Sequence, residues 1–171
     1  MPNRRIFVRG WQYLKAAGRP GPDLSWITDR LAVSGTVRPS DYDWLAQRHV
    51  EALLDLREED RGDPELLGQR GIDFLHIPVK DHFPPSQEQL DEGSQWVLQQ
   101  LEAGRRTVVH CKEGIGRSIA LACCVLMRTG YPLWDALALL ARKRWGVALN
   151  AVQMQALYEY DRRMNDGTSP R

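Results

Sequence analysis

The chain has 171 residues and a formal net charge of +1, with 43% hydrophobic and 26% charged residues, which is ordinary for a soluble globular domain. No apolar run approaches the roughly 18 residues of a transmembrane helix. The N-terminus also lacks the uninterrupted apolar core of a secretory signal, so we expect neither a membrane span nor export.

The three cysteines, at positions 111, 123 and 124, form neither a paired framework nor a zinc-binding spacing. We therefore expect a reducing compartment, the cytoplasm. The sequence implies no metal ion and no other cofactor. Cys123 and Cys124 lie inside an apolar segment and are expected to be buried core thiols.

In chain order, strands alternate with helices through the first half of the sequence. The apolar, β-branched segments are short, as buried strands are, and more polar segments separate them. The pattern predicts a strand at residues 30–33, a helix at 39–48, a buried strand at 50–56, a short helix at 64–70 and a strand at 72–77.

The second half opens with a capping box, in which Ser86 and Gln89 begin a helix that Gly104 ends. The elements that follow are a strand at 107–110, a helix at 118–129, a helix from near residue 132 to about 145, and a last helix at 151–164. This alternation predicts an α/β fold with a mainly parallel central sheet flanked by helices on both faces. Such sheets bind ligands at the carboxyl ends of their strands.

The segment between the strand at 107–110 and the helix at 118–129 carries the chemistry. From residue 110 it reads His-Cys-Lys-Glu-Gly-Ile-Gly-Arg-Ser. Gly114 and Gly116 allow a tight loop whose backbone N–H groups converge on one point, where the helix N-terminus adds its positive dipole end. Arg117 can hold two phosphate oxygens through its planar guanidinium. The expected phosphate-binding residues are Lys112, Glu113, Gly114, Ile115, Gly116 and Arg117.

Cys111 lies at the base of this loop and is the expected nucleophile. The loop amides, the helix N-terminus and the guanidinium all favour its thiolate form, so the sulfur can attack phosphorus without a separate base. Ser118 can donate its hydroxyl to the sulfur and make it a better leaving group. His110 is expected to support the loop, because successive strand residues point to opposite faces. An ordinary buried thiol at this turn would leave Arg117 unexplained.

Asp81, in a loop 30 residues before Cys111, is the expected general acid. A leaving alkoxide or phenoxide needs a proton as the P–O bond breaks, and a carboxylic acid above the loop can supply it. The resulting carboxylate can then take a proton from the water that hydrolyses the phosphocysteine. The alternative is a turn-forming aspartate beside two prolines, and His82 is a second candidate for the acid.

The run from His110 to Ser118 resembles the Cys-x5-Arg signature of the protein tyrosine phosphatase superfamily, in the form of the small dual-specificity phosphatases. The similarity covers about residues 26–163 and includes an aspartate about thirty residues before the cysteine. It implies the phosphatase fold and cysteine-dependent hydrolysis of phosphotyrosine in proteins, with phosphoserine and phosphothreonine as further substrates. It also implies that Asn150 or Gln153 positions the loop or a water molecule, although helix capping explains Asn150 equally well.

Two other activities stay open. Lys112, directly after the cysteine, is similar to the His-Cys-Lys-Ala-Gly form of phosphoinositide and phosphatidylglycerophosphate phosphatases, which act on lipids. Against this, Glu113 stands where alanine is common and would repel a multiply phosphorylated headgroup, and Ile115 supplies no second base. The other alternative is a phosphate-binding adaptor without turnover, which would need neither a nucleophile nor an acid.

The charge is unevenly distributed along the chain. Residues 1–22 contain five basic and no acidic side chains, whereas the remainder contains 18 basic and 22 acidic ones. We therefore expect a basic N-terminal segment at 1–22 and a single phosphatase domain at 23–171. Phe7, Trp11 and Leu14 recur at helical spacing, so the segment either contacts an anionic membrane or partner or packs its apolar stripe on the domain.

The basic run Arg142-Lys143-Arg144 ends a predicted helix. Bases in a last turn complement the helix dipole, so we expect a solvated helix end there. The expected partner is a phosphoprotein substrate. The sequence implies no nucleic-acid partner and indicates no particular oligomeric state.

Overall fold

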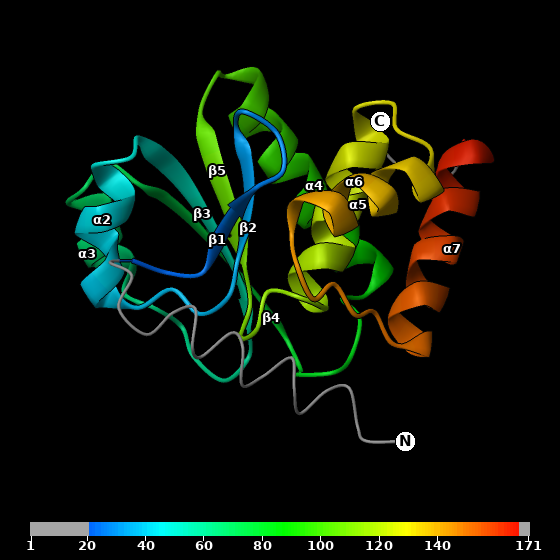
Figure 1. Ribbon diagram of the computed structural model, residues 1–171, viewed down its shortest axis with the longest axis horizontal. Coiled ribbons are helices and arrows are strands. Elements are labelled where there is room, and N and C mark those ends of the chain that lie inside the picture. The colour runs from blue at the N-terminus through cyan, green and yellow to red at the C-terminus, as the bar shows by residue number, and fades with distance from the viewer. Residues whose placement is uncertain (1–20, 168–171) are drawn as a thin grey trace.

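A computed structural model describes residues 21–167, which form a five-stranded sheet with helices on both faces (Figure 1). Most of the expected basic segment at 1–22 lies outside the described residues. The strands are β1 (Leu24–Trp26), β2 (Leu31–Ser34), β3 (Val50–Arg57), β4 (Asp73–Val79) and β5 (Arg106–His110). Their order in the sheet is β1-β2-β5-β3-β4, and all neighbours are parallel except β1 with β2. The predicted fold class is confirmed.

The helices divide between the two faces of the sheet (Figure 1). One face is covered by a 3-10 turn and two short helices, and the other by four longer helices. In chain order they are η1 (Pro39–Asp41), α2 (Tyr42–Ala46), α3 (Pro64–Gly68), α4 (Gln87–Glu102), α5 (Arg117–Arg128), α6 (Leu133–Lys143) and α7 (Ala151–Asn165). None of these helices combines the length and the apolar character that crossing a bilayer requires.

Strand β5 lies in the middle of the sheet, between β2 and β3. Its Val109 pairs with Val33 on β2 and Leu54 on β3, and all three side chains are fully buried. Strands buried on both faces are apolar throughout, which explains why they appear in the sequence as continuous apolar runs. Because the four parallel strands end at the same edge, the segments that follow them meet there.

Helix α5 is the central helix of the larger layer and packs against α4, α6 and α7. All of its residues from Arg117 to Met127 are buried. Cys123 and Cys124 are unpaired and fully buried in this helix, which confirms the prediction of core thiols. Burial raises the pKa of Cys123 to about 12 and also raises the pKa of Cys124.

Two elements differ from the prediction. Strand β1 was not expected, because three half-buried edge residues are too few to show a periodic pattern. The helix predicted at 39–48 is a 3-10 turn followed by a five-residue helix that ends at Ala46. His49 then adopts a left-handed φ of 55°, which reverses the chain into β3.

Candidate active site

The expected phosphate-binding loop lies between β5 and α5, at the carboxyl edge of the sheet. Cys111 follows β5 directly and is buried. Gly114 has a φ of 69°, and a Cβ there would lie 2.6 Å from the carbonyl of Ser34, so only glycine fits. Gly116 is the N-cap of α5, so the loop leads directly into the positive end of the helix that begins at Arg117.

Two polar groups lie at the sulfur of Cys111. The N–H of Gly114 donates a hydrogen bond to Cys111 Sγ at 3.3 Å. Ser118 Oγ, in the first turn of α5, lies 3.3 Å from the same sulfur and is itself buried. The backbone of the loop and the first turn of α5 thus both hold the sulfur in place.

Arg117 is buried and held by acceptors from three separate segments. Its Nη1 and Nη2 donate to Glu59 Oε2 and Oε1, both at 2.9 Å, in a fork-to-fork pair. Nη1 also donates to the carbonyl of Val79 at 2.7 Å. Nη2 also lies 3.0 Å from Asp81 Oδ1. Glu59 was not among the predicted site residues, because it lies in a polar stretch after β3 with no spacing that links it to Arg117.

The arginine and its glutamate shift each other's protonation. Burial would lower the pKa of Arg117, but the hydrogen bond with Glu59 and the charges of Cys111 and Asp81 outweigh it, so the pKa rises. The same hydrogen bond lowers the pKa of Glu59 to about 2. Both groups are therefore charged at neutral pH, and the guanidinium is fixed before a phosphate binds.

Asp81 lies in the loop between β4 and α4 and reaches the phosphate-binding loop. Besides its 3.0 Å contact with Arg117, its Oδ2 lies 3.8 Å from Lys112 Nζ. The side chain of Asp81 is 37% exposed. His82, with a left-handed φ of 68°, donates its backbone N–H to Asp81 Oδ1 at 3.1 Å. The structure thus brings Asp81 beside Arg117, the last residue of the loop that begins at Cys111.

The start of α7 holds the Asp81 loop in place. Asn150 and Gln153 form a capping box there. Asn150 Nδ2 also donates to the carbonyl of His82 at 2.7 Å, and Gln153 Nε2 donates to that of Phe83 at 3.4 Å. Gln153 also packs on the phosphate-binding loop, because a Cβ on Gly116 would lie 2.9 Å from its Nε2. Asn150 therefore both caps α7 and contacts the loop of the expected acid.

His110 is buried and faces β3. Its Nε2 lies 3.5 Å from Asp55 Oδ2, which also accepts a hydrogen bond from Arg57 Nη2 at 2.8 Å. Arg57 Nη1 donates to Asp60 at 2.7 Å. Burial lowers the pKa of His110 to about 4, so its imidazole is neutral at neutral pH. This network fixes the segment after β3 that carries Glu59.

Arg144 contradicts the expectation of a solvated helix end. It comes directly after α6 and is only 2% exposed, whereas its two preceding neighbours are exposed. Its guanidinium donates to the carbonyls of Glu113 and Gly114 in the phosphate-binding loop. The carboxylate of Asp23 lies 3.0 Å from Arg144 Nη2 and compensates the buried charge.

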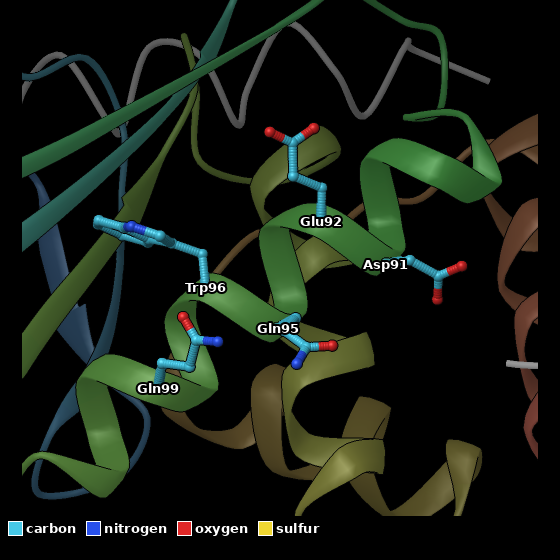
Figure 2. Close-up of a pocket in the computed structure, with 5 residues that line it drawn as sticks. All are labelled: Asp91, Glu92, Gln95, Trp96 and Gln99. Carbon is cyan, nitrogen blue, oxygen red and sulfur yellow. The ribbon is translucent and has the colours of Figure 1, made fainter. Parts of the chain in front are cut away.

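A hollow beside α4 lies apart from these residues (Figure 2). Its lining comes entirely from that helix: Asp91, Glu92, Gln95, Trp96 and Gln99. Asp91 pairs at 3.1 Å with Arg128 in the last turn of α5, whereas the phosphate-binding loop adjoins the first turn. The two ends of a helix of this length are about 17 Å apart, so the hollow is no part of the candidate site.

The parallel sheet and the loop at its carboxyl edge are those of a phosphatase of the protein tyrosine phosphatase superfamily. Comparison with protein families agrees, because the family described as "Polymorphic toxin system, DSP-PTPase phosphatase" matches residues 31–131. That match includes both Asp81 and the loop from Cys111 to Arg117. The chain therefore belongs to the DSP-PTPase phosphatases, as the resemblance in its sequence implies.

Its relatives include both lipid and protein phosphatases. The phosphatidylglycerophosphate phosphatase PTPMT1 of Arabidopsis thaliana is 32% identical over 92% of this chain and 49% of its own length. The protein tyrosine phosphatase PRL-1 of Leishmania major is 35% identical over 59% of this chain and 62% of its own length. The chain thus spans about half to three fifths of these two proteins. Among solved structures, Tk-PTP in its active form has a TM-score of 0.77 and 32% identity, covering 83% of this chain and 98% of its own.

Proposed function

We propose that the protein hydrolyses phosphotyrosine in proteins through a phosphocysteine intermediate on Cys111, with phosphoserine and phosphothreonine as further substrates. The observation that carries this proposal is the sulfur of Cys111 with the Gly114 N–H and the Ser118 hydroxyl each 3.3 Å away. A phosphate-binding adaptor would need the loop and Arg117 but neither a nucleophile nor an acid beside them.

In the first step, the Cys111 thiolate attacks phosphorus and forms an S–P bond while the bond to the leaving oxygen breaks. The loop amides and Arg117 bind the three remaining phosphoryl oxygens, where negative charge is concentrated. Asp81, in its protonated form, transfers its proton to the leaving oxygen, so the product departs as a neutral alcohol or phenol.

In the second step, water hydrolyses the phosphocysteine. The Asp81 carboxylate takes a proton from the water, whose oxygen attacks phosphorus as the S–P bond breaks. The electron pair of that bond returns to Cys111 as a thiolate. A hydrogen bond from Ser118 stabilises this thiolate, and inorganic phosphate is released.

Substrate binding rearranges the acid. Nη2 of Arg117 carries two hydrogens and meets two carboxylates, Glu59 at 2.9 Å and Asp81 at 3.0 Å. A phosphate oxygen that binds Nη2 therefore replaces Asp81, because Glu59 is held by both of its oxygens. Asp81 is thereby released from the guanidinium and becomes available to transfer a proton to the leaving oxygen.

A lipid phosphatase is the second candidate. Lys112 favours it, because this base follows the nucleophile and its side chain is 54% exposed, with only a long 3.8 Å pairing to Asp81, so it can contact a second anionic group. The plant relative, a phosphatidylglycerophosphate phosphatase by name, favours it too. The carboxylate of Glu113 lies in the same loop and opposes a crowded headgroup, so we expect poor turnover of inositol polyphosphates.

We also propose that the protein acts in the cytoplasm on a phosphoprotein partner. The unpaired state of the three cysteines, at positions 111, 123 and 124, supports a reducing compartment. A nucleophilic thiol needs such surroundings, because oxidation would inactivate it.

A substrate panel tests the proposal. We expect hydrolysis of p-nitrophenyl phosphate and of phosphotyrosine peptides, abolished by Cys111→Ser and retained by the control Cys123→Ala, whose thiol lies in the core. No hydrolysis of p-nitrophenyl phosphate would favour the adaptor. Turnover of phosphatidylglycerophosphate or phosphatidylinositol trisphosphate that exceeds turnover of the peptides would replace the protein substrate by a lipid.

A further inference from the structure

Arg144 is a buried charge that the proposed reaction does not use. Within residues 21–167, Arg117 and Arg144 are the two largest side chains that are fully buried. A buried guanidinium is costly to the fold unless its donors find partners. The partners of Arg144 therefore indicate its role, and they lead to the phosphate-binding loop.

The guanidinium of Arg144 joins that loop to the edge of the sheet. Nε donates to the carbonyl of Gly114, and Nη2 donates to the carbonyl of Glu113 at 3.2 Å. Nη1 donates to the carbonyl of Val33 on β2 at 3.3 Å and to that of Asp23 at 3.1 Å. Nη1 also donates to Ser25 Oγ on β1 at 3.1 Å, and the Asp23 carboxylate lies 3.0 Å from Nη2. One side chain thus fixes two successive loop carbonyls against β2 and the residue before β1.

Fixing a carbonyl also fixes the amide of the same peptide. A planar trans peptide points its C=O and its N–H in opposite directions. The peptide between Glu113 and Gly114 gives its oxygen to Arg144 and its N–H to Cys111 Sγ. The next peptide gives the oxygen of Gly114 to Arg144, so the N–H of Ile115 points to the opposite, inner side. Arg144 thereby orients the N–H of Gly114 toward the Cys111 sulfur and the N–H of Ile115 toward the inside of the loop.

The flanking carbonyls are also bound from outside the loop. The oxygen of Lys112 accepts hydrogen bonds from the N–H and the Oγ1 of Thr36, both at 2.9 Å. The oxygen of Ile115 accepts one from the N–H of Ala148 at 3.1 Å. Four successive carbonyls, from Lys112 to Ile115, thus have outer donors, and Arg144 supplies those of the central two.

We propose that Arg144 is a positioning residue for the phosphatase reaction, which keeps the central amides of the loop directed at the Cys111 sulfur and at the substrate phosphate. The inference rests on the proposed function, because orienting these amides matters only if the loop binds phosphate. Without Arg144, the two peptides can rotate and present carbonyl oxygens to the dianion, which repel it. A lysine cannot take its place, because a single ammonium does not reproduce the planar guanidinium that binds two loop carbonyls and a carboxylate at once.

Three variants of the full chain test this role. Arg144→Met removes the donors, Arg144→Lys keeps the charge near Asp23, and Arg142→Met is the control, since Arg142 is exposed in the last turn of α6. The measurements are kcat and KM for p-nitrophenyl phosphate, the inhibition constant of inorganic phosphate, and the thermal midpoint. We expect Arg144→Met to lower kcat/KM about 100-fold and to weaken phosphate inhibition, because misplaced amides no longer bind the anion. Arg142→Met should behave as wild type.

The inhibition constant separates positioning from a structural role. A purely structural arginine would reduce the fraction of folded enzyme and thus kcat, while the folded molecules would bind phosphate as before. If Arg144→Met does not fold, Arg144→Lys decides, with an expected loss of about tenfold in phosphate affinity. Wild-type phosphate affinity in a folded Arg144→Lys or Arg144→Met variant would overturn the inference. A wild-type protein that does not hydrolyse p-nitrophenyl phosphate would instead overturn the proposed function.

Discussion

Replacing Glu59 by glutamine should destabilise the protein at neutral pH but not in strong acid. The Glu59 carboxylate accepts two hydrogen bonds from Arg117 at 2.9 Å, and its pKa falls from 4.5 to about 2. A carboxyl whose pKa is lower in the folded state stabilises that state above its ordinary pKa. The stabilisation is lost as the pH falls from 4.5 through about 2.

The size of the effect follows from the same pKa values. A difference of about 2.5 between them corresponds to about 3.4 kcal/mol. The side chain of Glu59 is 39% exposed, so solvent screens its pairing with Arg117 and about half of this value applies. Because glutamine can still accept one hydrogen bond, we expect a loss of about 1–2 kcal/mol.

Urea unfolding of wild type and Glu59→Gln at about pH 7 and about pH 2.5 measures this difference. Glu58→Gln is the matched control, because the neighbouring side chain is exposed and should show no loss at either pH. We expect the Glu59→Gln loss at pH 7 to shrink at the lower pH, and kcat/KM at pH 7 to fall about tenfold as Arg117 loses its alignment. No loss at pH 7, or an equal loss at both values, would refute the reasoning.

Three further variants test the site. Asp81→Asn should slow hydrolysis of phosphotyrosine peptides about 100-fold or more, and it should slow hydrolysis of an activated aryl phosphate less, because that leaving group needs no proton. The same variant should bind inorganic phosphate more tightly as an inhibitor, because the carboxylate no longer competes for Arg117. Equal losses for both substrates would reassign the acid. Ser118→Ala should slow breakdown of the phosphocysteine, so stopped-flow measurement should show a burst of the first product. A steady-state rate equal to that of wild type, with no burst, would show that Ser118 takes no part in the mechanism. Gly114→Ala should lower the free energy of unfolding in urea more than Gly71→Ala does. Both glycines have a φ of 69°, but only at Gly114 would the added Cβ clash with other atoms, among them Nη2 of Arg144. Equal costs would show that φ alone matters.

The part of the site that the sequence predicted is the part whose chemistry is local. Cys111, Arg117 and Ser118 lie within eight consecutive positions, so the strand before them and the helix after them fix their relation without long-range contacts. The central sheet was also predictable from local sequence, because strands buried on both faces appear as apolar runs of strand length. The prediction of Asp81 as the general acid depended on the resemblance to known phosphatases as well as on the chemistry of a carboxylic acid.

The missed residues depend on contacts distant in the sequence. Glu59 pairs with Arg117, although the two residues are 58 positions apart in the sequence. No local sequence pattern around either residue predicts this pairing. Arg144 stands in a basic helix end, where a solvated side chain is the ordinary outcome. Its burial depends on Asp23, 121 positions earlier, and on loop carbonyls that no side-chain pattern encodes. Sequence patterns predict elements, whereas charge pairing inside the fold requires the three-dimensional arrangement.

The most direct test of the account is to find where the phosphoryl group goes during turnover. The wild-type protein is mixed with an isotopically labelled phosphotyrosine peptide, quenched in acid within the turnover time, digested and analysed by mass spectrometry. We expect one phosphoryl group on the peptide that contains Cys111, bound to the sulfur, and none in Cys111→Ser. A turning-over enzyme with the label on another side chain, or with turnover retained in Cys111→Ser, would contradict the role of Cys111 as the nucleophile.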